Sequence, residues 1–241
     1  MKLRLVFIFS FILGSLFSQT DNGRVYNMFW FGYYNYTQLN SKWNLNTDIQ
    51  HRTRDGFKTQ SQTLIRSAAL YKINKLLSVS FGGAHFRYYI KNNLTRGEWR
   101  PWQEFGANSE YGKVRIGNRL RMEQRFNQIS INEDVTEDYR FNWRFRYKID
   151  VELPLIITKG NTHSLSICNE FFVNSGNSIV NPFDQNRSFV SLNFQLSNSI
   201  KLLFQYMYIV QYIQAQNNYD KISVIRFNIH HTIKNERSTN K

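Results

Sequence analysis

Cysteine, proline and acidic residues are all scarce in this chain. Cys168 is the only cysteine among 241 residues, and there are 3 prolines. A single cysteine cannot form an intrachain disulfide, which excludes a small secreted domain stapled by disulfides. The 17 acidic residues face 31 basic ones, so the formal net charge is +14. Such a charge suggests nucleic acid or anionic lipid as a partner.

Long apolar runs are missing after the first twenty residues. The chain begins "MKLRLVFIFSFILGSLFSQT", where Lys2 and Arg4 precede an apolar run that ends near Phe17. This order is typical of a secretory signal peptide. We predict cleavage near residue 19, with 20–241 forming one domain. Beyond Thr20 no stretch approaches the ~18 apolar residues of a transmembrane helix. Any membrane crossing must therefore use strands, and export leaves no role for nucleic acid.

Alternation of polar and apolar residues is what the sequence has in abundance. In "YRFNWRFRYKIDVEL", aromatic and aliphatic residues from Tyr139 to Leu153 alternate with residues from Arg140 to Glu152 that are all charged except Asn142. At ~3.3 Å per residue this run could extend about 50 Å, more than the ~9–11 residues with which a tilted strand crosses a bilayer. Aromatics make up 16% of the chain, as interfacial aromatic girdles would require.

Ten further runs show the same period of two. They are Val25–Tyr36, Lys42–Arg52, Gln60–Ile73, Leu77–Ile90, Trp99–Tyr111, Lys113–Phe126, Ser164–Val173, Arg187–Leu196, Lys201–Gln214 and Lys221–Ile233. Short connections such as "YG" alternate with longer ones such as "NQISINEDVTED", as in outer-membrane barrels. Bacterial single-chain barrels have an even number of strands. We therefore predict ten to twelve strands, with twelve favoured over the eleven runs that can be read.

The unlike polarity of the two faces of these strands distinguishes a membrane barrel from a soluble sandwich. An arginine facing lipid at the bilayer centre costs ~2–4 kcal/mol, whereas an aromatic face in water would be an exposed apolar patch that monomeric soluble proteins rarely carry. A large soluble sandwich could bury the aromatic side. The signal peptide and the run lengths favour a transmembrane antiparallel up-and-down β-barrel, with charges in its lumen.

Several segments also resemble a known family. The stretches "NRLRMEQRF", "YRFNWRFRYKIDVELPL", "NEFF" and "DQNR" are similar to those of predicted outer-membrane β-barrels of Bacteroidota, a family known only as a domain of unknown function. The resemblance implies a barrel in the outer membrane of a Gram-negative cell, and it implies no substrate.

Alternation assigns a set of charged side chains to the lumen as a charge network or pore lining. They are Arg66, Glu104, Arg115, Arg119, Arg121, Glu123, Arg125, Arg140, Arg144, Arg146, Glu170 and Arg187. Arginine–carboxylate pairs could fill and rigidify a narrow interior, which favours a structural or accessory subunit of an envelope complex. Surplus arginines could instead line a small anion-favouring pore. Outer-membrane lipid, lipopolysaccharide and other envelope proteins are the expected partners.

Enzymatic motifs are not readable. His163 and Ser164 are adjacent and so fall on opposite faces of a strand, which argues against a lipid-acting His–Ser pair. No HExxH motif, phosphate-binding loop or cysteine metal cluster is present, and we expect neither a cofactor nor a metal. Aromatics such as Trp30, Tyr33, Trp99, Trp102 and Trp143 are expected to face lipid or its interface.

Overall fold

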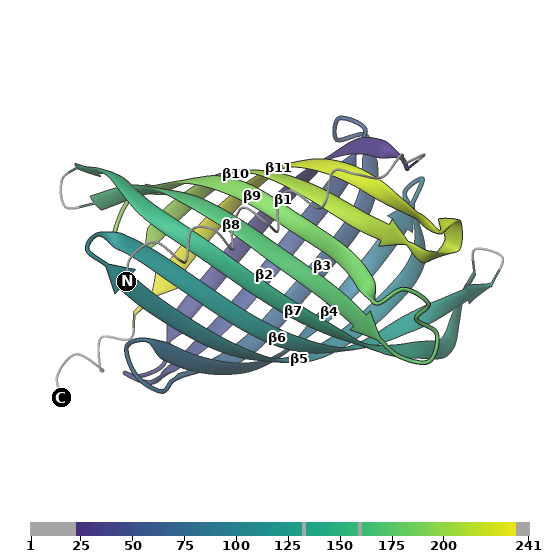
Figure 1. Cartoon of the computed structure of the whole chain (residues 1–241), viewed down its shortest axis with the longest axis horizontal. Helices are drawn as coiled ribbons and strands as arrows, with labels where there is room; N and C mark the ends of the chain where they lie inside the picture. The colour runs from purple at the N-terminus through teal and green to yellow at the C-terminus, as the bar shows by residue number, and fades with distance from the viewer. Residues whose placement is uncertain (1–22, 132–133, 159–160, 235–241) are drawn as a thin grey trace, which may run out of the picture.

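The alternating runs form strands of one closed sheet in the computed structural model, which describes residues 23–131, 134–158 and 161–234 (Figure 1). The predicted signal peptide and the basic tail from residue 235 lie outside the described residues. The strands are β1 (Val25–Gln38), β2 (Trp43–Arg54), β3 (Thr59–Lys72), β4 (Leu77–Ile90), β5 (Asn93–Tyr111), β6 (Val114–Ile131), β7 (Asp134–Thr158), β8 (Asn161–Ser175), β9 (Phe183–Gln195), β10 (Ile200–Ile213) and β11 (Asn218–Ile233).

The prediction of a closed β-barrel is confirmed, but twelve strands is wrong, because the described residues form a ring of eleven. Neighbouring strands in the chain pair antiparallel all round the barrel. The closing pair differs: with an odd count β1 and β11 run the same way, and they pair in parallel from Val25 opposite Lys221 to Thr37 opposite Ile233. The eleven readable runs were the right count. The even-number rule misled because it assumes an antiparallel closure.

The predicted contrast between short and long connections is also largely wrong. The segment "KNNLTRGE", which the predicted runs Leu77–Ile90 and Trp99–Tyr111 leave as a longer connection, is not a loop, because β4 and β5 are joined by Lys91 and Asn92 alone, both with positive φ. That backbone is the one a tight two-residue hairpin requires. Likewise only residues 132–133 separate β6 from β7. The residues that were predicted as loops lengthen the strands of these hairpins instead, and among the described connections only residues 176–182 form a longer one.

The two ends of the barrel are named here by these hairpins. The long-hairpin end, on the right in Figure 1, holds the β4–β5 and β6–β7 connections and residues 176–182. The short-turn end holds the β5–β6 and β9–β10 connections and the end of β11. A single turn of 3₁₀ helix, η1 (Gln214–Gln216), precedes β11. Among the described residues, no helix has the length and apolarity needed to span a membrane.

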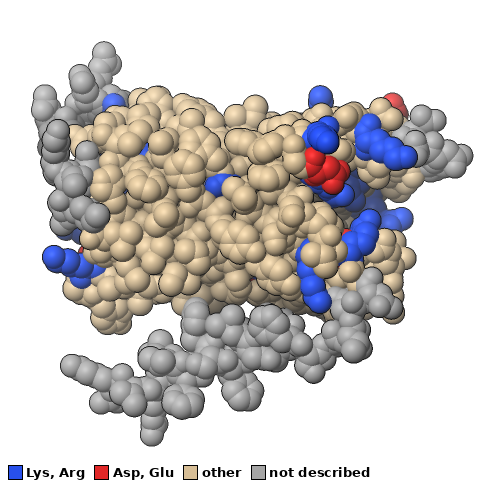
Figure 2. Space-filling model, turned by 90° about the horizontal axis from the view of Figure 1, so that it is seen from above, with Lys and Arg blue, Asp and Glu red and all other residues tan. Residues whose placement is uncertain are grey.

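The strands present apolar side chains outward and polar ones inward. On β6, Leu120 is 56% exposed, whereas the neighbouring Arg121 and Glu123 are buried. Figure 2 shows that charged side chains gather toward the ends of the barrel and that the middle of the face in view is almost free of them. The interior itself has two unlike walls: β5 to β9 carry charged groups, and β10, β11 and β1 carry an apolar cluster.

Candidate functional site: a charged network inside the barrel

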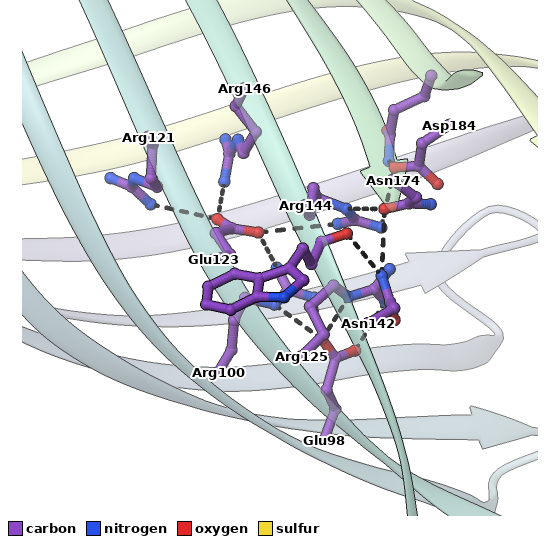
Figure 3. A network of polar contacts seen from close by, with 12 residues as sticks. Glu98, Arg100, Arg121, Glu123, Arg125, Asn142, Arg144, Arg146, Asn174 and Asp184 are labelled. Atoms are coloured by element: carbon purple, nitrogen blue, oxygen red, sulfur yellow. Dashed lines mark hydrogen bonds and ion pairs between the residues drawn. The ribbon is translucent and has the colours of Figure 1, made fainter. Parts of the chain in front are cut away.

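Inward-facing side chains of β5 to β9 form one continuous set of ion pairs, called here the Arg/Glu network. Figure 3 shows the part of it around Glu98 and Glu123. The network joins six arginines to five carboxylates across five adjacent strands. Its members are Glu98, Arg100, Glu104, Arg119, Arg121, Glu123, Arg125, Arg144, Arg146, Glu170 and Asp184. The period of two on each strand is what brings these side chains to one surface.

Glu123 is the centre of this network. Its side chain is 1% exposed, and its carboxylate lies 2.5 Å from Arg146 Nη1 and 3.4 Å from Arg100 Nη1. Arg121 and Arg144 approach it to 3.7 and 4.0 Å. Four guanidinium groups from three strands therefore converge on one buried carboxylate, which holds β5, β6 and β7 in a fixed relation.

Glu98 forms a second centre nearer the long-hairpin end. This fully buried carboxylate accepts hydrogen bonds from Arg125 Nε at 2.7 Å and Nη2 at 3.0 Å. Arg100 Nε donates to it at 2.8 Å and the Tyr88 hydroxyl at 2.7 Å. The two-pronged contact with Arg125 is the geometry in which arginine binds carboxylates most strongly.

The network continues toward the short-turn end through shared partners. Arg119 contacts Glu104 at 3.4 Å and also hydrogen-bonds Glu170. Arg121 donates to Glu104 at 2.6 Å, and Arg146 to Glu170 at 2.6 Å. Because most members have two partners, removal of one charge would disturb several others.

Aromatic rings cover the guanidinium groups on their other side. Arg100 lies 3.9 Å from the ring centre of Phe86, Arg121 4.1 Å from Trp102, and Arg146 4.5 Å from Phe172. Cation–π contacts of this kind are stronger where water is excluded. The arginines are therefore held between carboxylates and rings.

Two tryptophans that were expected to face lipid lie inside. Trp30 is 4% exposed and Trp102 is 6% exposed. A side chain at Gly82 would meet the Trp102 ring at 2.5 Å, so the glycine makes room for the indole. The expectation failed for a simple reason: Trp99 and Trp102 are three residues apart and must point to opposite faces of one strand. Trp99, at 54% exposed, is the outward one.

The structure places eight of the twelve predicted residues in the network; the other four lie elsewhere. Arg66 pairs with Asp48 at 2.9 Å, and Arg115 pairs with Glu152 at the short-turn end. Arg140 is exposed at the long-hairpin end. Arg187 donates to Gln185 at 2.8 Å and lies over the Phe172 ring. The role of these residues as charge network or pore lining stays a prediction.

Sequence reasoning missed Glu98, Arg100 and Asp184. Glu98, Arg100 and Glu104 share one face of β5, and the same period of two continued from Glu104 back to Glu98 would have found the first two. Asp184 was missed because it precedes the predicted run Arg187–Leu196, whereas β9 already begins at Phe183.

Three adjoining cavities run along the lumen beside the network. An outer cavity of about 1000 Å³ opens at the long-hairpin end and is lined by Arg140 and Asn127 among others. An upper cavity of about 290 Å³ follows it, and a lower cavity of about 290 Å³ lies toward the short-turn end. The upper and lower cavities share five lining residues, namely Trp30, Arg52, Arg66, Arg146 and Arg187. These side chains stand between the two.

Metal chemistry finds no support in the part of the barrel that the structure describes. No group of three or more histidine, cysteine, aspartate or glutamate side chains there could hold a metal ion. Cys168 is buried and unpaired with any other cysteine. The expectations that the chain uses no cofactor and is not an enzyme stay predictions.

The fold and the network define a class: a closed eleven-stranded β-barrel with a buried arginine–carboxylate network in its lumen. The chain belongs to the family described as protein of unknown function (DUF2490), whose sequence model matches residues 27–221. That range reaches from β1 into β11 and includes the whole Arg/Glu network. Comparison with curated proteins and with solved structures finds no match.

Proposed function

We propose that this protein is an outer-membrane β-barrel of a Gram-negative bacterium, as its resemblance to barrels of Bacteroidota implies, and that it acts as a structural or accessory subunit of an envelope complex. The observation that carries the proposal is the polarity of the two faces of the barrel, which is the reverse of that of a water-soluble protein. Apolar side chains lie outside, and a paired charge network lies inside. Leu120 and Phe145 are exposed on the outer face, whereas Glu123 is buried. A closed barrel of this polarity suits lipid, because no sheet edge is left unpaired.

The ends of the barrel agree with such a placement. Exposed basic residues at the long-hairpin end include Lys58, Arg87, Lys91 and Arg140, and Figure 2 shows basic side chains gathered near that end. Phosphate groups of lipopolysaccharide would be favourable neighbours for them. We therefore place the long-hairpin end at the outer leaflet, with the predicted signal peptide of residues 1–19 removed on export.

Arginine substitutions on the outer face test the membrane placement. Leu120→Arg would put a charge at the middle of the apolar belt and cost about 2–4 kcal/mol if the belt faces lipid, whereas Tyr139→Arg, near the long-hairpin end, should cost about 0–1 kcal/mol. The measurement is the fraction of heat-modifiable barrel recovered from the outer-membrane fraction of expressing cells. Equal recovery of the two variants, or a soluble wild-type protein, would contradict the proposal.

A filled lumen separates an accessory barrel from a channel. The side chains of Trp30, Arg52, Arg66, Arg187 and the network residue Arg146 line both the upper and the lower cavity, so they stand on the path between the two. The test is single-channel conductance in planar bilayers for wild type, Arg121→Ala and Arg144→Ala. We expect correctly inserted wild-type barrels to be silent.

A small anion-favouring pore is the second candidate, and the surplus of lumen arginines favours it. Arg52, Arg187 and Arg226 all project into the lower cavity and form no ion pair among the described residues. Rings of such charges set anion selectivity in channels. Steady wild-type conductance with an anion preference, reduced in the two arginine variants, would identify the pore and reject the filled lumen.

A further inference from the structure

The upper cavity has an extreme imbalance of charge. Ten arginines line it, and Asp220 is the one carboxylate among its lining residues. Glu98 and Glu123 are absent from this lining, since they are 0% and 1% exposed behind the arginines that pair with them. The guanidinium groups therefore form the surface of the cavity, and the carboxylates that neutralise part of their charge lie in the wall.

Four of the lining arginines, namely Arg52, Arg54, Arg96 and Arg187, form no ion pair in the part of the chain that the structure describes, and Arg52 and Arg187 hydrogen-bond only uncharged groups. Arg52 donates hydrogen bonds to Gln62 and to Gln50, and its Nε–H has no acceptor. Arg187 donates to Gln185 at 2.8 Å. Both side chains are partly buried, and taking a charge out of water without a counter-ion is costly, so an anion would stabilise these two positions.

Trp30 brings these two arginines together. Arg52 lies 3.7 Å from the centre of its ring system and Arg187 lies 5.4 Å from it. The indole Nε1–H has no hydrogen-bond acceptor among the described atoms. The site thus combines two guanidinium groups with one free N–H donor beside them.

Apolar side chains beside Trp30 line the same cavity. Met28, Ile209 and Ile222 are among its lining residues, and together with Trp30 they belong to the buried cluster of β1, β10 and β11. At about 290 Å³ the cavity is near the lower limit of small-molecule sites, which span ~300–1,000 Å³. It adjoins the outer cavity through shared residues that include Arg54 and Arg96, so a ligand has a route from the long-hairpin end.

We infer that the upper cavity is a binding site for a small amphiphilic anion. The anionic group, a phosphate, sulfonate or carboxylate, is held by Arg52 and Arg187 beside Trp30, and a short apolar group packs on Met28, Ile209 and Ile222. This assigns a ligand site to a barrel whose proposed role is structural. It does not depend on whether the lumen conducts ions.

Calorimetric titration of the purified full barrel in dodecyl maltoside tests the site. The probes are octyl phosphate, inorganic phosphate and the uncharged octyl glucoside. We expect octyl phosphate to bind at one per barrel, inorganic phosphate to bind at least tenfold more weakly, and octyl glucoside to give no saturable signal. Equal binding of the first two probes would overturn the apolar part of the site, and saturable binding of octyl glucoside would overturn the anionic part.

Variants locate the site. Arg52→Gln and Arg187→Gln should each weaken octyl phosphate binding at least tenfold, and neither leaves a carboxylate without its partner. Arg140→Gln is the matched control, because Arg140 lines the outer cavity but not the upper one, and its affinity should stay within threefold of wild type. Heat-modifiable migration shows that each variant is folded. Unchanged binding in both folded variants, or no binding by folded wild type at millimolar octyl phosphate, would overturn the inference, and neither result depends on the membrane placement.

Discussion

The two walls of the lumen bury their side chains by different means. On β5 to β9, Glu123 and its arginine partners form a network in which each charge depends on its neighbours. On β10, β11 and β1, Met207, Ile209 and Val224 pack with almost no exposed surface. Apolar packing is non-directional, whereas an ion pair requires its partner at a set place. One wall therefore fixes geometry, and the other supplies burial.

The apolar wall coincides with the parallel seam of the barrel. Parallel pairing is slightly less stable per residue than antiparallel pairing, and here it joins the two ends of the chain. Met28 of β1 and Val224 of β11 are opposite each other across the seam. At the long-hairpin end Arg24 donates to the buried Asp220 at 2.8 Å, which adds an ion pair to the closure. The hydrogen bond from Arg24 to Asp220 raises the pKa of the Arg24 guanidinium.

The largest effect is expected where the charged wall loses its centre. Glu123→Gln removes the charge on which Arg100, Arg121, Arg144 and Arg146 converge, so uncompensated buried charge should cost about 3–5 kcal/mol. The free energy of unfolding would be measured in urea with the barrel in neutral detergent. Glu110→Gln on the neighbouring β5 is the control, since Glu110 is exposed. Similar losses for the two variants would show that the network contributes nothing special.

A smaller loss is expected on the apolar wall. Val224 is fully buried, and Val224→Ala removes two methyl groups and leaves a small void, at a cost of about 2 kcal/mol. Val190→Ala is the same change on the outer face of β9, where Val190 is 44% exposed. The same urea titration should show little change for the control in detergent. If Val190→Ala lowered the free energy of unfolding as much as Val224→Ala, the apolar wall would not be more tightly packed than the outer face.

The smallest change in the free energy of unfolding is expected for Arg52, which belongs to neither wall. Arg52→Gln removes hydrogen bonds to neutral partners and a contact with Trp30, but it leaves no carboxylate unpaired. The lost hydrogen bonds and ring contact destabilise the barrel, whereas removal of an unpaired positive charge stabilises it. The two contributions to the free energy of unfolding should offset each other to within about 1 kcal/mol. Arg146→Gln, which deprives both Glu123 and Glu170 of a partner, should cost several times more in the same urea titration. Equal costs would contradict the division of the arginines into paired and unpaired groups.

Much of the barrel was predictable from local pattern. Eleven alternating runs correspond to eleven strands, and inward assignment of Arg121, Glu123 and Arg146 follows from parity alone. Errors arose where a general expectation replaced the pattern. The rule of an even strand number was preferred to the eleven runs that could be counted. The expectation that tryptophans face lipid was preferred to the alternation along β5, which puts Trp102 inside.

The sequence by itself determined which face each side chain takes, because the strand period of two is a property of the backbone. It could not determine which charges meet, since partners such as Glu98 and Arg125, or Arg144 and Asp184, come from different strands whose alignment depends on barrel register. Closure likewise required the whole sheet, because only an odd number of strands bent into a ring brings β1 beside β11 in parallel. The apolar wall and the arginine-lined cavity facing it exist only once that ring is closed.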